Sequence, residues 1–193
     1  MTPSKLLRNV TAMLDRANDP GPVLAAIGDL MVASADRNFE AEGRPAWAPV
    51  KAATAKRKTK AGHEKILMWS GALARSITFK VNGNAVAAGT NSPYGRIHNE
   101  GGVIDHPGRT GTVRLRTDVR GNLLRQGTEG RASRLAVFAK GSHKRAVERA
   151  FTHGAYPIPM PARPFLMFQP GETETYGALV LNYILTGRIG GQP

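Results

Sequence analysis

Basic side chains are the residues of this sequence whose type and spacing could do chemistry. They lie in two groups, a run within residues 51–65 and a predicted strand face: Lys56, Arg57, Lys58 and Lys60, then Arg114, Arg116 and Arg120. Side chains of this kind contact phosphate groups, and such binding is salt-dependent and indifferent to base sequence. A solvated face explains the run at 51–65 equally well. We take both groups as candidate surfaces for a partner or for DNA.

Catalytic and metal-binding residues form no recognisable pattern. The sequence has no P-loop, dinucleotide-binding fingerprint, HExxH or GxSxG motif. Its 14 carboxylates are scattered, its five histidines lack the spacing of metal ligands, and it contains no cysteine. We therefore predict no enzymatic activity, no metal and no cofactor. A small hydrolase is the enzymatic alternative, and it would need a nucleophile–base pair that the sequence does not display.

The charge of the chain is concentrated in its middle. The 193 residues carry a formal net charge of +13, and residues 51–149 hold 20 Lys/Arg against 6 Asp/Glu, whereas both ends are nearly neutral. A concentrated excess indicates a surface that faces something anionic, such as DNA or an acidic protein. We expect no signal peptide and no membrane span, because the apolar stretches are short.

The elements that would position these residues begin with helices. Apolar spacing predicts a helix over 4–17 and a second one from 20–22 to near Gly43, paired as a helical hairpin. Trp47 is expected to pack on the core. Residues 51–65 permit a short helix or a mobile arm, and Ser70 could cap a short helix that ends at Arg75.

The central and C-terminal segments mix strands with helices. Asn82-Gly83 predicts a tight hairpin between 76–81 and 84–90, and a short helix should run from Tyr94 to Gly101-Gly102. Alternation predicts a strand at 112–117 that returns at 135–139, with 141–156 partly flexible. Pro164 restricts the run 163–168 to an edge or the start of a strand. A last helix should span 172–186.

These elements predict an α+β fold in which a small, mostly antiparallel sheet is packed by the N-terminal helical hairpin and the C-terminal helix. We predict a single domain over 1–193. Within it, 103–160 would form an extended basic hairpin or arm, and 188–193 would be a loose tail.

Five segments in this order resemble the phage virion morphogenesis (tail completion) family, which includes the G protein of Mu-like phages and the tail completion protein S of P2-like phages. The segments are 39–47 with the basic stretch that follows it, 66–73 with 76–77 after it, 86–90, 94–102 and 158–166. Within them, the residues expected to be architectural are Trp47, Ser70, Gly71, Tyr94, His98, Gly101, Gly102, Pro161, Arg163, Pro164 and Phe165. His98 is expected to pack or form hydrogen bonds, and Arg163 could also pair with a carboxylate of a neighbouring subunit.

The resemblance implies a structural virion protein that acts in tail completion and head–tail joining at the neck. It implies no active site. We expect the protein to be assembled in the host cytoplasm and to be located in the neck or tail of the virion. We expect a homo-oligomeric ring, a hexamer that matches the tail, whose partners are neck or connector proteins and tail tube proteins. Phage genomic DNA could be a further partner through non-specific phosphate contacts. The alternative is a basic nucleic-acid-binding protein that does not read sequence.

Overall fold

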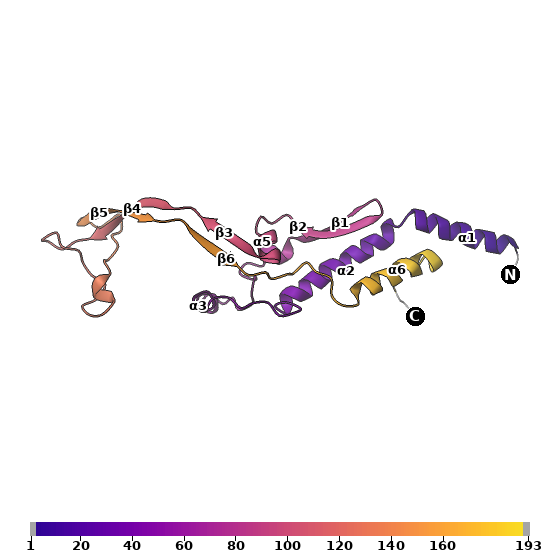
Figure 1. Cartoon of the computed structure of the whole chain (residues 1–193), viewed down its shortest axis with the longest axis horizontal. Coiled ribbons are helices and arrows are strands. Elements are labelled where there is room, and N and C mark those ends of the chain that lie inside the picture. The colour runs from indigo at the N-terminus through magenta and orange to yellow at the C-terminus, as the bar shows by residue number, and fades with distance from the viewer. Residues whose placement is uncertain (1–2, 191–193) are drawn as a thin grey trace. The chain divides into compact units, whose positions relative to one another are not determined.

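The computed structural model describes residues 3–190, and the contacts between them divide the chain into two compact units. Unit 1 lies within Met1–Gly102 and Met160–Pro193, and unit 2 is Val103–Pro159. Figure 1 shows helices and one β-hairpin in unit 1, and paired strands in unit 2. Unit 2 covers nearly the residues predicted for the inserted arm, whereas a single domain over 1–193 stays a prediction.

Unit 1 is built around α2 (Gly21–Glu40). The hairpin of β1 (Ile77–Asn82) and β2 (Ala85–Thr90) packs against α2, and α6 (Glu172–Thr186) contacts both α2 and α1 (Pro3–Asn18). In Figure 1 the hairpin and α6 lie on opposite sides of α2. The α+β class and the helices at both ends are therefore confirmed.

The predicted hairpin of the first two helices is wrong in its direction. α1 and α2 follow one another end to end, with a bend at their junction, instead of folding back on each other (Figure 1), and α1 packs on α6. The reason lies at the junction, where Pro20 keeps helical angles, with φ −78° and ψ −2°, and its carbonyl accepts the Leu24 amide at 3.0 Å. Proline is tolerated at a helix start, so Pro20 interrupts the helix without reversing the chain.

The β-hairpin is confirmed, with its turn one residue later than predicted. Asn82 pairs with Ala85, so the two loop residues are Gly83 and Asn84. Gly83 has φ +57°, which suits a glycine at the first position of a tight hairpin turn. Behind the hairpin, a Cβ on Gly28 of α2 would lie 2.2 Å from the Phe79 ring. Glycine at position 28 therefore lets β1 lie against the helix.

Two buried apolar clusters hold unit 1 together. The first joins the end of α2 to the segments at 47, 73–77 and 165, and consists of Ala35, Phe39, Trp47, Leu73, Ile77 and Phe165. The second joins the start of α2 to α6 and consists of Val23, Leu24, Ile27 and Tyr183. Since apolar burial is the main favourable term in folding, these clusters are the stability core of the chain.

Three short helices complete unit 1: α3 (Ala52–Lys60), α4 (Ala72–Arg75) and α5 (Gly95–Glu100). The basic run at 51–65 was predicted to be either a short helix or a mobile arm, and α3 shows that it contains a helix. Gly71 is the N-cap of α4, and the Ser70 hydroxyl one residue earlier accepts the Ala72 amide at 3.3 Å. Gly101 ends α5 with φ +75°, a positive angle that glycine commonly adopts just after a helix.

The segment 163–168 is not a strand, which corrects the sequence prediction. Several of its polar backbone groups are bonded to side chains instead of to a neighbouring strand. The side-chain Oδ1 of Asn99 accepts the amides of Phe165 and Leu166 at 3.0 and 2.9 Å, and the side-chain amide of Asn38 donates to the Phe165 carbonyl at 3.0 Å. Buried backbone groups need partners, and here two asparagines supply them.

Unit 2 consists of two-stranded pairs and long loops. β3 (Gly102–His106) pairs with β6 (Tyr156–Met160), and β4 (Arg109–Arg116) pairs antiparallel with β5 (Ala146–His153). A single turn of 3₁₀-helix, Ala132–Arg134, lies in the loop between β4 and β5.

The partner of β4 differs from the predicted one. Residues 146–153, expected to be partly flexible, form β5, and the 135–139 segment makes only isolated bridges. Its Val137 carbonyl accepts the Arg116 amide at 2.8 Å, and its Ala139 amide donates to Arg114 at 2.8 Å. β5 and this segment both bond to β4, because a strand has two edges for hydrogen bonding.

Two further expectations concern the ends and the apolar segments of the chain. The loose tail predicted for 188–193 falls partly on residues 191–193, which lie outside the described residues. None of the helices within 3–190 combines the length and the hydropathy that a membrane span requires.

Candidate interaction surfaces

An apolar stripe on α1 is the largest run of exposed hydrophobic side chains on one element. Leu6, Leu7, Val10 and Leu14 are 45–68% exposed. Leu7, Val10 and Leu14 recur at helical spacing, so they share one face. Contiguous exposed apolar residues of this kind mark a protein-interaction surface.

Unit 2 has almost no core of its own. Leu115 on β4 is the single buried side chain between residues 103 and 159, whereas Phe138 is 65% and Val119 75% exposed. Two-stranded ribbons are marginally stable in water unless a further surface covers them. The ribbon therefore presents apolar and backbone groups that a partner can cover.

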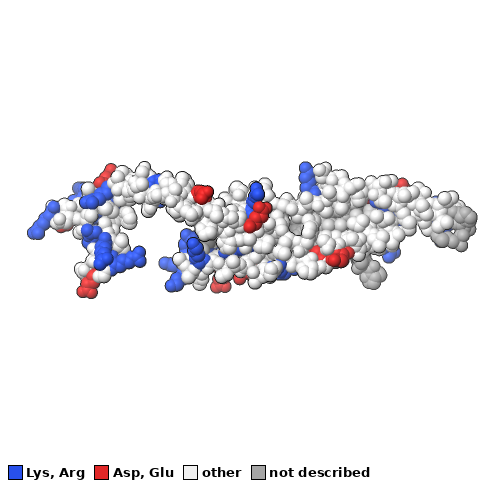
Figure 2. Space-filling view, viewed as in Figure 1, with Lys and Arg blue, Asp and Glu red and all other residues white. Residues whose placement is uncertain are grey.

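Unit 2 also carries much of the positive charge. It holds 11 Lys/Arg against 4 Asp/Glu, and Figure 2 shows blue side chains spread over the region of β4 and β5. Arg114 and Arg116 stand two apart on β4 and share a face, and Arg114 lies 3.6 Å from Glu148. Arg120 lies beyond the end of β4, so the predicted row of three arginines on one strand face is reduced to two.

The turn that holds Arg120 is ordered by Asp118. Its carboxylate accepts the amides of Asn122 and Arg120, each at 2.8 Å. These hydrogen bonds, first of all those from Asn122, lower the pKa of Asp118.

The basic run on α3 divides into exposed and buried members. Lys56, Arg57 and Lys60 are exposed, whereas Lys58 is buried and donates to the Lys65 carbonyl at 2.7 Å. Arg57 also lies 5.6 Å from the centre of the Trp69 ring, which is 46% exposed. The sequence prediction did not single out Trp69, although an aromatic residue near a basic run was the available signal.

Several family-motif residues meet in the first core cluster. The Trp47 ring packs edge-on against Phe39 with 5.6 Å between the ring centres, and its indole nitrogen donates to the Pro164 carbonyl at 3.0 Å. Phe165 is fully buried, with its ring 5.0 Å from that of Phe39. Trp47 is thus the core anchor that the sequence predicts.

Arg163 is committed within unit 1. It is 5% exposed and donates to the carbonyls of Ala48 and Pro49 at 2.9 and 3.3 Å. Burial lowers the pKa of its guanidinium. Within the chain Arg163 therefore joins two loops, and its pairing with a carboxylate of a neighbouring subunit stays a prediction.

The remaining motif positions shape the backbone. Gly71 has φ +70°, and a Cβ on Gly101 would lie 2.7 Å from the Ala162 amide and 3.0 Å from the Met160 carbonyl. Gly102 has φ +141°, which also favours glycine. Tyr94 and Pro161 are exposed and belong to neither buried cluster.

His98 packs within unit 1, and its backbone carbonyl accepts the Arg163 amide at 2.8 Å. Its Nδ1 is buried and has no hydrogen-bond partner among the described residues. Burial, and then the Arg163 charge, lower the pKa of His98 below its ordinary value. The folded protein therefore keeps this imidazole neutral at neutral pH.

A pH dependence of stability follows from His98. The unfolded chain protonates this residue more readily than the folded chain, so the free energy of unfolding should fall as the pH drops from about 7.5 to about 5.5, through the ordinary pKa of histidine near 6.5. His98→Gln should flatten this slope in urea-unfolding series. Equal slopes in wild type and His98→Gln would contradict the assignment.

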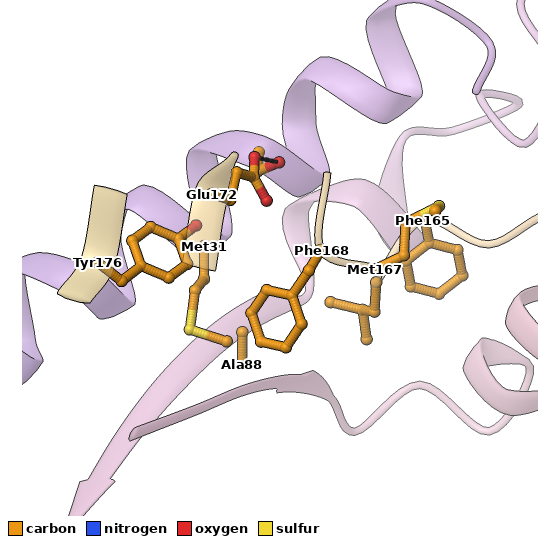
Figure 3. Close-up of a pocket in the computed structure, with 9 residues that line it drawn as sticks. Met31, Ala88, Phe165, Met167, Phe168, Glu172 and Tyr176 are labelled. Atoms are coloured by element: carbon orange, nitrogen blue, oxygen red, sulfur yellow. Dashed lines mark hydrogen bonds between the residues drawn. The ribbon is translucent and has the colours of Figure 1, made fainter. Parts of the chain in front are cut away.

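A cavity of about 200 Å³ opens between α2, β2, α6 and the 165–168 segment. Figure 3 shows Met31, Phe168 and Tyr176 around it, together with Glu172. The carboxylate of Glu172 is occupied, because it accepts the Ser34 hydroxyl and the Gln169 amide. The lining of the cavity is mainly apolar, and the described residues contain no cluster of three or more metal-binding side chains.

Comparison with known proteins gives the family. The profile of the phage virion morphogenesis family matches residues 2–185, nearly the whole chain. The protein belongs to this family. It is also 32% identical over 99 residues to the Mu-like prophage FluMu G protein 2 of Haemophilus influenzae. That alignment covers 49% of this chain and 65% of the relative. No solved structure matches the chain.

As a member of the phage virion morphogenesis family, the protein has a structural or morphogenesis role in a bacteriophage. Trp47 and Phe165, which carry part of the resemblance, form its core, while the α1 stripe, the basic side of α3 and unit 2 form its outer surfaces. Surfaces with these properties suit a protein that works through contacts with other macromolecules.

Proposed function

We propose that the protein completes the phage tail and joins it to the head at the neck, as a ring of identical subunits. The observation that carries the proposal is the nearly coreless unit 2, with Leu115 as its single buried residue. Ordering an extended ribbon costs conformational entropy that so little burial does not offset. A neighbouring subunit or an adjacent ring would supply the missing surface.

The apolar stripe on α1 supports association between identical subunits. Closed rings form when one patch of a subunit docks on a different patch of the next and the rotation closes. The α1 stripe is one such patch, and the exposed Leu181 and Leu185 on α6 offer apolar surface on a second helix. Six copies would match the symmetry of the tail.

A charge placed on the α1 stripe should dissociate the ring. We expect Leu7→Glu combined with Leu14→Glu to shift the protein from an oligomer to a monomer in light scattering coupled to size exclusion. The reason is that carboxylates would have to be buried unpaired in the interface. Helical circular dichroism should be unchanged, because both side chains are already exposed.

Asn9→Glu serves as the matched control on the same helix, since Asn9 is exposed and polar. It should leave the oligomer intact. A wild-type protein that is monomeric at every concentration tested, or a double variant that stays oligomeric, would contradict ring formation through this stripe.

Particles made without the protein test its place in assembly. A phage that carries an early stop codon in this gene should yield separate heads and unfinished tails in negative-stain images, and the wild-type gene supplied in trans should restore joined particles. Normal infectious virions from the mutant would overturn the proposal.

Non-specific nucleic-acid binding is the second candidate, favoured by the 11 Lys/Arg against 4 Asp/Glu in unit 2. Phosphate contacts by these residues would make the affinity for unrelated duplex DNA fall steeply with salt. Arg114→Gln with Arg116→Gln should then reduce the slope of log affinity against log salt by about two. Absence of binding at low salt would leave these charges for protein partners.

A further inference from the structure

The exposed side of α3 differs in chemistry from the α1 stripe. The helix and the residues that flank it carry exposed cations and one exposed tryptophan, which we call the α3–Trp69 patch: Lys51, Lys56, Arg57, Lys60, Lys65 and Trp69. Figure 2 shows blue side chains gathered over α3. We propose that the α3–Trp69 patch binds the phosphate backbone of duplex DNA. The identification of DNA as the natural ligand rests on the proposed place at the neck, where the genome passes.

No carboxylate within the described residues 3–190 neutralises the cations of the patch. Among residues 3–190, none of its Lys or Arg side chains forms an ion pair, and Glu64 is the only carboxylate within 51–65. Lys56 and Lys60 stand four apart on α3, so two like charges lie on one face of the helix, a spacing that destabilises an isolated helix. An external polyanion would satisfy charges that the fold leaves unpaired.

Trp69 lies beside Arg57, one of the exposed cations of the patch. Arg57 lies 5.6 Å and the buried Lys58 5.9 Å from the ring centre, and the His63 ring lies 4.9 Å from it. A guanidinium that packs on an aromatic ring keeps its N–H groups available in the plane, where they can bind a phosphate. The ring is thus engaged by protein groups, which favours phosphate contact over stacking on bases.

The absence of apolar neighbours favours DNA over an acidic protein. Trp69 is the only large hydrophobic residue exposed between positions 31 and 93, whereas α1 alone exposes four. The centres of protein–protein interfaces are enriched in aromatic residues and methionine and depleted of lysine. A nucleic-acid backbone needs no apolar centre, only a set of cations.

The first measurement is the salt dependence of binding of the full-length protein to a fluorescently labelled random-sequence duplex. Removing two contacts in Lys56→Gln with Lys60→Gln should reduce the slope of log affinity against log salt by about two. At about 0.1 M salt the affinity should fall roughly ten- to hundredfold. The control Lys5→Gln with Lys80→Gln removes the same charge from exposed sites on α1 and β1, and should change the affinity far less.

Tryptophan emission locates the contact. Trp47 is 7% exposed and Trp69 46%, so a DNA-induced change should arise from Trp69 and disappear in Trp69→Phe, whose DNA affinity is measured separately through the labelled duplex. Circular dichroism and urea unfolding of each variant test whether its fold is intact.

Three results would overturn the inference: equal affinities for the Lys56/Lys60 and Lys5/Lys80 variants, an unchanged Trp69 signal with saturating DNA, or tighter binding of a poly-glutamate peptide than of the duplex. A phage whose tails are complete without the protein would overturn the proposed function instead, and would leave these binding results standing.

Discussion

Phe165→Ala should lower the free energy of unfolding by about 3–5 kcal/mol, the range for truncation of a fully buried phenylalanine. Phe165 is 0% exposed and packs on Phe39 with 5.0 Å between ring centres. Its backbone is held by Asn38 and Asn99, so the segment cannot easily move to fill the space. Most domains have only 5–15 kcal/mol of stability, so the variant should unfold at a much lower urea concentration.

Phe168→Ala is the matched control, three residues along the same segment. Phe168 is 57% exposed and touches the Tyr176 ring edge-on, with 6.2 Å between centres. An aromatic pair of this kind contributes about 0.5–1.5 kcal/mol, so the control should unfold near the wild-type midpoint. If both variants unfolded at the same midpoint, Phe165 would not be the centre of the core.

Removal of unit 2 should leave unit 1 folded and abolish assembly. The two chain segments that lead into unit 2 lie side by side, because a Cβ on Gly101 would be 3.0 Å from the Met160 carbonyl. A short Gly-Ser linker from Gly102 to Met160 can therefore replace 103–159. Every buried hydrophobic residue except Leu115 lies outside the deleted segment, so the urea midpoint should stay close to that of the wild type.

Function should respond differently from stability. A phage with the deleted form as its only copy should produce no joined particles, because the surface proposed to reach the neighbouring subunit or ring is gone. Arg114→Gln with Arg116→Gln keeps the ribbon and separates the loss of charge from the loss of the arm. Infectious particles from the deletion phage would show that unit 2 is dispensable; an unfolded deletion protein would show that the two units depend on each other.

Helices and turns could be predicted from the sequence where they depend on contacts between residues close together in the chain. The apolar spacing of α6, the glycine that ends α5 and the tight turn near Gly83 all depend on neighbouring residues, and all three are confirmed within a residue or two. The alternation at 112–117 predicted β4. Its partner was missed because β5 mixes Arg, Glu and His with apolar residues, and strand pairing is decided by long-range contacts.

Positions that depend on tertiary packing were not predictable in the same way. Arginine is a residue type that usually lies at the protein surface. The two backbone carbonyls that accept hydrogen bonds from Arg163 lie more than a hundred residues away in sequence. Lys58 is different, since a signal existed: with Thr54 and Ala55 it forms the inward side of α3 at helical spacing. Helical periodicity alone would have separated Lys58 from its exposed neighbours.

An electron cryomicroscopy map of the intact virion tests the central claim most directly. We expect density for this protein as a ring of copies at the head-proximal end of the tail, with unit 2 of each copy against a neighbouring subunit or the adjacent ring. Density at the distal end of the tail, or none in the virion, would contradict the account.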